Sequence, residues 1–211
     1  YVDLYQIHRW DYEVPIEETL IVMDELVRSG KVRWVGTSNY ASWQVCEILN
    51  LASRHGYKPT TIAQQMYNLI ARGLEQEFIP FSRQHNVSII AYNPLAGGLL
   101  TGKHSPSQII PGTRFDDNRM YQDRYWHPQN FEAVALLTGI AKKAGRSLVS
   151  LAFGWLLQQE DVDCVILGAS CPEQLEQNLA ACQEAPIALE LMRECDEIWR
   201  RLRGPSPVYN R

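Results

Sequence analysis

The stretch VDLYQIHRWDYEVPIEETLIVMDELVRSGKVRWVGTSN, residues 2–39, decides the fold class. Residues 2–8 and 32–37 are short apolar runs typical of strands. Between them, residues 15–29 place apolar side chains at helical spacing, which predicts an amphipathic helix. A strand, a helix and a second strand in this order predict two parallel strands with the helix packed outside the sheet.

The alternation of strand and helix continues along the chain. Further strands are expected at residues 62–66, 87–92 and 164–167, and further helices at residues 41–55, 74–85, 131–144, 147–159, 172–184 and 188–202. A long polar stretch, residues 93–130, separates the fourth strand from the next helix. Five strands, each followed by a helix, predict an α/β protein with a parallel sheet.

Two architectures fit this alternation: a doubly wound open sheet and a (β/α)8 barrel. An open sheet that binds a nucleotide usually carries G-x-G-x-x-G directly after a strand, and the sequence has no such run. Polar side chains instead follow all five strands, and in a barrel these strand ends share the face that holds the active site. The pattern favours a (β/α)8 TIM barrel. We expect residues 1–211 to form its C-terminal portion, with about three strands missing before Tyr1.

Composition excludes several classes of function. The net charge of -4 argues against binding of duplex nucleic acid. The longest apolar run, residues 151–157, is far shorter than the roughly 20 residues that span a bilayer. The five cysteines are odd in number and form no CxxC, which indicates a reduced, cytoplasmic protein without a zinc module.

The polar residues at the strand ends have two interpretations each. His8 is a structural hydrogen-bonding residue or a donor to a substrate carbonyl. Ser38 and Asn39 would cap the next helix, or would join Gln64 in binding the donors and acceptors of a carboxamide. Tyr92 packs in the core or offers a flat surface to an aromatic ring.

The glycine-rich segment NPLAGGLLTGK follows the fourth strand. Gly97, Gly102 and Lys103 have the spacing of a P-loop, but His104 stands where a P-loop needs Ser or Thr to hold Mg²⁺. A P-loop is therefore not expected. Glycine-rich backbone beside a lysine still suits a phosphate, and Arg114 would add a forked contact.

Two more segments attract attention. SCPEQLEQN opens a helix, with Ser170 as a plausible cap and Pro172 in the first turn; alternatively its N-terminus binds a phosphate. One loop is crowded with Arg119, Tyr121, Arg124, Tyr125, Trp126 and His127. We interpret this loop as a lid or substrate-contact segment, with packing of the loop on the barrel as the alternative.

Together these segments resemble the aldo-keto reductase superfamily. VDLYQIH is similar to the family's fourth strand with its active-site His, and VGTSNY, AQQMYN, NPLAGGLLTGK and ILGAS-x-x-EQLEQN are similar to its cofactor segments. Within the superfamily, the chain resembles the aflatoxin aldehyde reductase (succinic semialdehyde reductase) family most. That likeness rests on SNYASWQVCEI, MYQDRYW, FEA, EQLEQNLAA and the terminal Tyr-x-Arg at residues 209–211.

The resemblance implies a barrel enzyme that uses NADPH to reduce aldehydes or ketones, including aldehydes with a carboxylate group, to alcohols. It implies that His8 is catalytic and orients the carbonyl. The cofactor-binding residues it implies are Ser38, Asn39, Gln64, Tyr92, Asn93, Pro94, Leu95, Ala96, Gly97, Gly98, Lys103, Arg114, Gly168, Ser170, Gln174, Gln177 and Asn178. The substrate-binding residues it implies are Tyr121, Arg124 and Arg211, and it implies no metal.

The chain also departs from the family's pattern. The family's proton donor is a Tyr assisted by a Lys and an Asp on earlier strands, and no residue of this sequence stands in a matching context. His8 is the one member of that tetrad represented, so we expect residues 1–211 by themselves to be inactive. Two alternatives stay open, a non-catalytic NADP-binding subunit and an inert fragment, and so does assembly into a homodimer.

Overall fold

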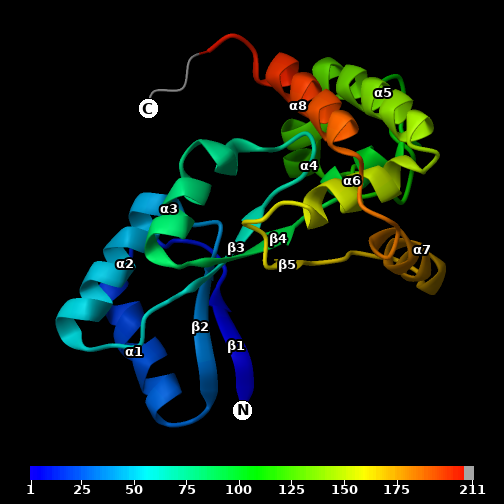
Figure 1. The fold of residues 1–211 in the computed structure, drawn as a ribbon. Coiled ribbons are helices and arrows are strands. Elements are labelled where there is room, and N and C mark those ends of the chain that lie inside the picture. Colours follow the sequence, from blue (N-terminus) through cyan, green and yellow to red (C-terminus); the bar gives the residue numbers. More distant parts are fainter. Residues whose placement is uncertain (207–211) are drawn as a thin grey trace. The chain divides into compact units, whose positions relative to one another are not determined.

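A computed structural model describes residues 1–206 of the chain, which divide into two compact units (Figure 1). Unit 1 comprises Tyr1–Met66, Gly73–Ala91 and Asp161–Cys164. Unit 2 comprises Tyr67–Arg72, Tyr92–Glu160 and the described chain from Val165 onward.

A five-stranded parallel sheet runs mostly through unit 1. Its strands are β1 (Val2–Ile7), β2 (Val32–Ser38), β3 (Ile62–Met66), β4 (Ser88–Tyr92) and β5 (Cys164–Val165). Their order in the sheet, β1-β2-β3-β4-β5, is their order in the sequence. The predicted α/β fold is confirmed, and this order is that of consecutive strand–helix units of a (β/α)8 barrel.

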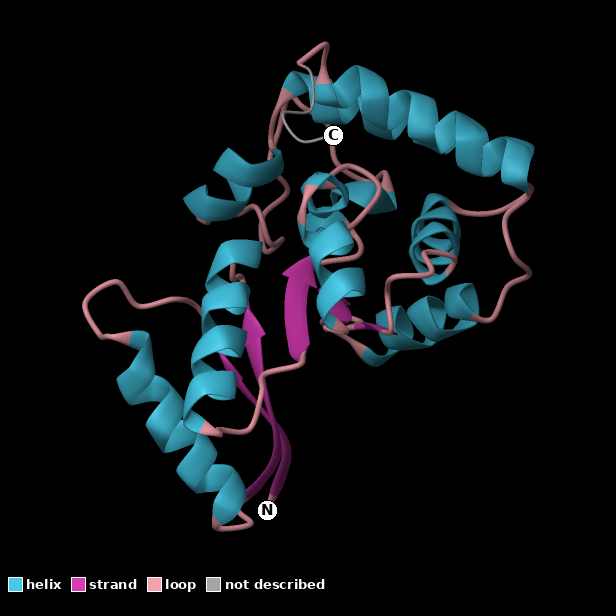
Figure 2. Ribbon diagram, turned by 60° about the vertical axis from the view of Figure 1, so that its left-hand side comes forward, coloured by secondary structure: helices cyan, strands magenta, loops and turns pink. Residues whose placement is uncertain are grey.

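One face of this sheet is fully covered. Val35, Thr37 and Ala63 on that face are buried, while Trp34 on the other face is 50% exposed. Because side chains alternate between the faces of a strand, the covering helices must all lie on the first face, as Figure 2 shows for unit 1. They are α1 (Ile16–Arg28), α2 (Ser42–His55) and α3 (Phe78–His85), and the 3-10 helix η1 (Gly73–Gln76), which has no buried residue, precedes α3.

Unit 2 is a group of helices around the apolar helix α6. Its members are the 3-10 helix η2 (Ala96–Thr101), α4 (Arg119–Tyr125), α5 (Pro128–Lys143), α6 (Leu148–Leu157), α7 (Pro172–Cys182) and α8 (Leu189–Arg203). Trp155 of α6 is fully buried against the ring of Tyr67. The guanidinium of Arg72 lies over the same indole and pairs with Asp196 at 2.8 Å, which fastens α8 to the unit.

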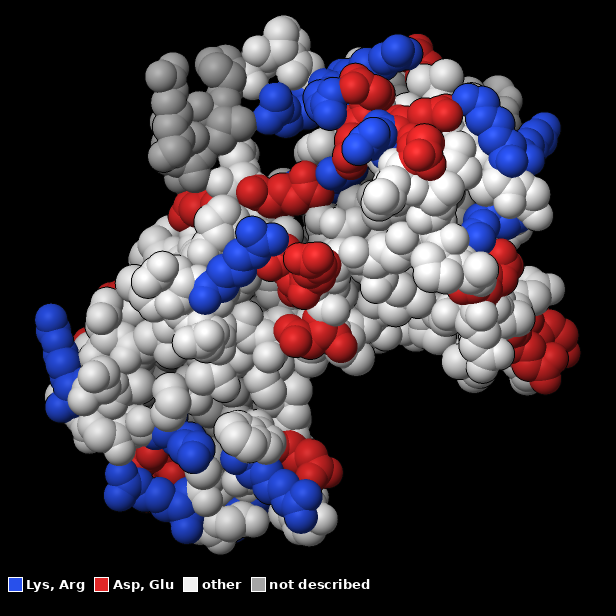
Figure 3. Space-filling view, in the orientation of Figure 1, with Lys and Arg blue, Asp and Glu red and all other residues white. Residues whose placement is uncertain are grey.

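The outer side of α8 carries mixed charges. Figure 3 shows acidic and basic side chains interspersed over this part of unit 2, where Lys143 of α5 pairs with Glu194 at 2.6 Å. Exposed pairs of this kind contribute about 0–1 kcal/mol each, so the unit depends on its apolar core. No helix within residues 1–206 has the length and hydropathy needed to cross a membrane.

The structure corrects the helix expected at residues 74–85. That helix is divided at Glu77 into η1 and α3, and α3 begins at Phe78. An uninterrupted helix would place Pro80 in its interior, where the proline ring clashes with a carbonyl one turn earlier. The restart at Phe78 puts Pro80 in a first turn, where its missing N–H costs nothing.

The strand expected at residues 164–167 was also wrong in length, because β5 has only two residues. The polar stretch of residues 93–130, for which no element was predicted, contains η2, α4 and the start of α5. Helix α4 is too short to show a hydrophobic period, but the Asn118 side chain caps it by accepting from Tyr121 N.

A single substitution tests how closely the side chains of β1 and the backbone of β3 approach β2 at Gly36. At Gly36, an added Cβ would lie 2.9 Å from the Ile62 carbonyl oxygen and 3.2 Å from Gln6 Cγ. We expect Gly36→Ala in the full-length protein to lower the free energy of unfolding by about 1–3 kcal/mol. Gly139→Ala in α5 is the matched control, because nothing lies within 4 Å of its added Cβ. It should raise the same free energy by about 0.5–1 kcal/mol. Equal denaturant midpoints for Gly36→Ala and the wild type would contradict the close approach.

Candidate functional site

Four predicted site residues meet at the carboxyl ends of β1, β2 and β3 in unit 1. The Asn39 side-chain Nδ2 donates to the His8 carbonyl oxygen at 3.1 Å and to Ser38 Oγ at 2.9 Å. The Asn39 backbone N–H donates to the Gln64 carbonyl oxygen at 3.1 Å. Asn39 adopts a φ of 60°, a left-handed conformation that asparagine tolerates better than most residues. The structure therefore joins all four residues through Asn39.

The capping interpretation of Ser38 and Asn39 was wrong. The N-cap of α2 is Ala41, whose N–H donates to Gln44 Oε1 at 2.8 Å. Ser38 is instead the last residue of β2 and is only 2% exposed. Both polar side chains consequently serve the strand-end cluster.

His8 is exposed at the rim of this cluster. Its imidazole makes no hydrogen bond to any residue in the described part of the chain, and the cluster holds it through the backbone carbonyl alone. Because the ring is exposed, it is available to a ligand, and the role of His8 as a donor to a substrate carbonyl stays a prediction.

One residue of this region was missed by the sequence analysis. Gln64 Nε2 donates to Gln6 Oε1 at 3.0 Å, while Gln6 Nε2 is enclosed without a hydrogen-bond partner. The available signal was a polar glutamine inside the otherwise apolar end of the first strand. Because its partner lies 58 positions away, the sequence pattern alone did not connect the two amides.

In unit 2, a tyrosine and arginine cluster surrounds α4. Arg124 donates a hydrogen bond to the Tyr92 hydroxyl and lies over the Tyr121 ring, 5.6 Å from its centroid. Burial raises the pKa of Tyr92, and the positive charge of Arg124 opposes that shift. Arg114 also lies over the Tyr121 ring, at 5.3 Å. The two guanidinium groups are thus held by aromatic rings.

Tyr125, the last residue of the same helix, is fully buried. Its hydroxyl accepts from Asn93 Nδ2 at 2.8 Å and from Asn68 Nδ2 at 3.2 Å. Burial raises the pKa of Tyr125 far above its ordinary value of 10. Asn93 Oδ1 in turn accepts from Gly97 N at 2.7 Å. The Asn93 side chain consequently holds the glycine-rich segment against α4.

The glycine-rich segment folds as a 3-10 helix rather than as a P-loop. The N–H groups of Gly97 and Gly98 are already used, by Asn93 Oδ1 and by the Leu95 carbonyl oxygen. Lys103 is exposed and has no ion-pair partner within residues 1–206. Phosphate recognition in this segment would therefore depend on the Lys103 side chain more than on those glycine amides.

The start of α7 is organised by side chains of its own first turns. Ser170 N and Oγ both donate to Gln174 Oε1 at 3.0 Å, and Asn178 Nδ2 donates to the Gly168 carbonyl oxygen at 3.0 Å. The N-cap is Cys171, so the capping role expected for Ser170 was wrong, whereas Pro172 occupies the first turn as expected. Gln177 is exposed on this helix, and Arg211 lies outside the described residues.

The crowded loop combines packing with exposed groups. The Trp126 ring contacts Phe115, His104 and Phe131, with centroids between 4.9 and 5.6 Å apart. Tyr125 is buried as well, so packing explains these two aromatic residues. Tyr121 and Arg124 remain partly exposed, and they retain the interpretation as substrate contacts.

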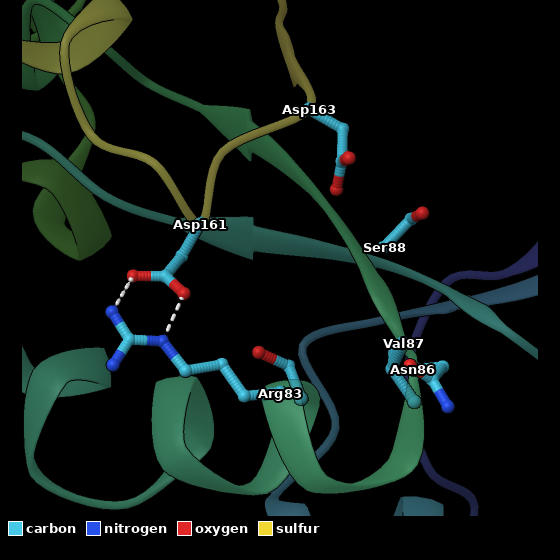
Figure 4. Close-up of a pocket in the computed structure, with 7 residues that line it drawn as sticks. Arg83, Asn86, Val87, Ser88, Asp161 and Asp163 are labelled. Atoms are coloured by element: carbon cyan, nitrogen blue, oxygen red, sulfur yellow. Dashed lines mark hydrogen bonds and ion pairs between the residues drawn. The ribbon is translucent and has the colours of Figure 1, made fainter.

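A separate polar hollow of about 270 Å³ lies in unit 1, next to α3 and the start of β4. Figure 4 shows Arg83 of α3 facing Asp161, with Arg83 Nη2 donating to Asp161 Oδ2 at 2.7 Å. Asp163 Oδ2 accepts from Ile89 N at 2.8 Å. Arg83 and Asp161 thus pair with each other and Asp163 bonds to the backbone of β4, while none of the predicted site residues lines the hollow. Its role is to fasten the segment before β5.

The sequence is similar to those of several known proteins along most of its length. The sequence model described as "Aldo/keto reductase family" matches residues 1–200. "Aflatoxin B1 aldehyde reductase member 2" of Mus musculus is 40% identical over 226 residues, covering 100% of this chain and 61% of that protein. "Aldo-keto reductase family 7 member A3" of Homo sapiens is 39% identical, covering 100% of this chain and 68% of that protein.

A bacterial protein is similar too. "L-glyceraldehyde 3-phosphate reductase" of Escherichia coli O157:H7 is 35% identical, covering 93% of this chain and 58% of that protein. The chain thus spans between 58% and 68% of the length of these three relatives. The resemblance inferred from the motifs is confirmed.

Removal of one hydroxyl tests the buried network of unit 2. Tyr125→Phe deprives the Nδ2 groups of buried Asn68 and half-buried Asn93 of a shared acceptor, so we expect the free energy of unfolding to fall by about 1–3 kcal/mol. Tyr5→Phe, at a position 46% exposed, should change it by less than about 0.5 kcal/mol. The raised pKa of Tyr125 adds a pH dependence, because above pH 10 the unfolded chain loses this proton first and stability falls. That fall should be shallower in Tyr125→Phe. Equal urea midpoints for all three proteins would exclude the network.

Proposed function

This chain belongs to the aldo/keto reductase family, and from that premise we propose that the full-length protein reduces an aldehyde or ketone to the alcohol with NADPH. The observation that carries the proposal is the cluster at the ends of β1, β2 and β3. There Asn39 connects His8, Ser38 and Gln64 through three hydrogen bonds. A parallel α/β barrel places its chemistry at these strand ends.

The residues present fit a nicotinamide cofactor. In unit 1, the side chains of Ser38, Asn39 and Gln64 offer the donors and acceptors that a carboxamide requires. Gln64 Oε1 accepts no hydrogen bond within residues 1–206 and is not enclosed, so it is available to such a group. In unit 2, exposed Lys103 and Arg114 supply positive charge for phosphate groups.

Each group of residues receives one part of the cofactor in this proposal. Ser38, Asn39 and Gln64 hold the carboxamide, and Tyr92 packs on the nicotinamide ring. The phosphates are assigned to the segment with Asn93, Pro94, Leu95, Ala96, Gly97, Gly98 and Lys103, together with Arg114. The adenosine end is assigned to Gly168, Ser170, Gln174, Gln177 and Asn178. When bound, NADPH supplies the hydride.

His8 orients the substrate. Its ring, free of protein partners in the described chain, donates a hydrogen bond to the carbonyl oxygen and holds the carbonyl carbon in position. Proton transfer to that oxygen is assigned to the family's Tyr with its Lys and Asp, none of which has a counterpart in this sequence. The five free cysteines support a reducing, cytoplasmic setting.

The substrate class follows from Arg124. Its guanidinium is held by the Tyr92 hydroxyl and the Tyr121 ring, so it is available in a fixed position for a forked contact with a carboxylate. Tyr121 and Arg211 are assigned to the same substrate group. We infer that aldehydes with a remote acidic group are preferred. The bacterial relative's name likewise specifies an aldehyde that carries an anion, a phosphate.

Turnover of NADPH tests the proposed activity. The full-length protein should oxidise NADPH in the presence of an aromatic or acidic aldehyde, followed by the absorbance of the reduced nicotinamide. The polypeptide of residues 1–211 should show no rate above background, because it lacks the proton donor. Absence of NADPH oxidation by the full-length protein with every aldehyde and ketone tried would refute the proposal, with tight NADPH binding then indicating the non-catalytic alternative.

A substitution on α4 tests the substrate class. Arg124→Met in the full-length enzyme should lower kcat/KM for an acidic aldehyde by about 10- to 100-fold, because a charged hydrogen bond is lost. A neutral aldehyde of similar size should be nearly unaffected. Arg119→Met is the control, since this residue lies on the same helix, is exposed and, within residues 1–206, forms an ion pair only with Asp123, at 3.5 Å. Equal losses on both aldehydes would assign Arg124 a purely structural role.

A further inference from the structure

Strand register places two glutamine side chains on one face of the unit 1 sheet. Gln6 of β1 is paired with Gly36 of β2, and Gln64 of β3 is paired with Ser38 of β2. Gly36 and Ser38 are two positions apart, so they face the same side of β2. All four residues consequently share the face opposite to Val35 and Thr37.

Gly36 leaves the space that Gln6 needs to cross β2. A Cβ at Gly36 would lie 3.2 Å from Gln6 Cγ and 3.2 Å from Leu4 Cδ1. Both of these side chains from β1 therefore lie against the bare backbone of the middle strand. Because Gly36 has no side chain, the Gln6 side chain extends across β2 and contacts Gln64 of β3. Strands β1 and β3 are not themselves paired in the sheet.

The contact between the two amides determines which atom of Gln64 is left for a ligand. Gln64 Nε2 donates to Gln6 Oε1 at 3.0 Å. Gln64 Oε1 accepts no hydrogen bond within the described chain, and it is absent from the group of enclosed unpartnered atoms, so it is open to solvent. An amide with its NH₂ group committed presents its oxygen.

We propose that Gln6 is a positioning residue, which acts through Gln64 by fixing Gln64 Oε1 as the acceptor for the NH₂ group of the nicotinamide carboxamide. This inference rests on the proposed function, which assigns the carboxamide to Gln64. Gln6 itself touches no part of the cofactor in this arrangement. In its observed orientation, the Gln6 oxygen faces Gln64 Nε2 and so disfavours the flipped Gln64 amide, which would present a donor where the carboxamide also presents one.

The enclosed Nε2 of Gln6 supports a role beyond stability. A buried donor without an acceptor destabilises the folded state, and an apolar side chain of similar shape would avoid that penalty. A merely structural position 6 would therefore be served better by leucine. The orientation of Gln64 gives a reason for a glutamine at this position.

Two cofactor analogues separate the donor from the acceptor of the carboxamide. The 3-acetylpyridine analogue of NADP replaces the NH₂ group by a methyl group, whereas the thionicotinamide analogue keeps NH₂ and replaces the oxygen by sulfur. The wild-type full-length protein should bind the acetyl analogue about 3- to 10-fold more weakly than NADP, which corresponds to one neutral hydrogen bond. It should bind the thio analogue through Gln64 as it binds NADP.

The experiment measures dissociation constants of NADP and both analogues by quenching of tryptophan fluorescence, and melting temperatures, for the wild type and three variants. Gln6→Leu should weaken NADP binding about 3- to 10-fold, leave the acetyl analogue unchanged and keep or raise the melting temperature. Gln6→Glu keeps an acceptor for Gln64 Nε2, so the ratio of the dissociation constant of the acetyl analogue to that of NADP should stay as in the wild type. Gln65→Leu is the structural control, because Gln65 Nε2 donates to the buried Tyr40 carbonyl oxygen at 2.7 Å. It should lower the melting temperature without changing the ratio.

Each other outcome has one meaning. A wild-type ratio of acetyl analogue to NADP in Gln6→Leu would overturn the positioning role. Equal weakening of all three ligands together with a lower melting temperature, as for a damaged fold, would overturn it as well. Failure of the wild-type protein to bind any of the three dinucleotides would instead overturn the proposed function and this inference with it.

Discussion

The parallel pairing of β1, β2 and β3 in one register is the constraint on which the candidate site depends. It brings His8, Ser38 and Gln64 to one edge of the sheet, although the chain separates His8 from Gln64 by two helices. Asn39 then fixes their relative positions. Its side-chain amide donates to the His8 carbonyl oxygen and to Ser38 Oγ, and its backbone N–H donates to the Gln64 carbonyl oxygen. Its left-handed backbone conformation is what allows one residue to face both neighbouring strands.

Unit 2 depends on a buried polar network in the same way. The Tyr125 hydroxyl accepts from Asn93, and Asn93 accepts from Gly97, so a loop without regular pairing is held in one conformation. Such a network is stable only when every enclosed donor has an acceptor. The N–H groups of Gly97 and Gly98 are therefore already bonded within the protein. An anion that binds this segment would depend on charged side chains such as Lys103.

Local patterns predicted the elements well where the pattern itself is local. The strand at residues 62–66 has the predicted bounds, and the helices after residue 130 are within a few positions of those expected. Prediction failed at Phe78, where Pro80 restarts the helix, and at α4, whose seven residues are too few to show a period. The capping roles expected for Ser38 and Ser170 failed because the two helices begin later, with N-caps at Ala41 and Cys171, and because nearby side chains, Asn39 and Gln174, engage these hydroxyls.

The sequence by itself determined the strand–helix order, the family motifs and the chemical types at the strand ends, because each is written in neighbouring residues. Only the tertiary structure decided the partners. Gln6 meets Gln64 across 58 positions, and Asn93 meets Tyr125 across 32. Both contacts require a particular register or loop conformation, and the first also requires Gly36, whose missing side chain leaves space for Gln6. Register and close packing are properties of the assembled chain, since a shift of one residue turns every side chain to the other face of a sheet.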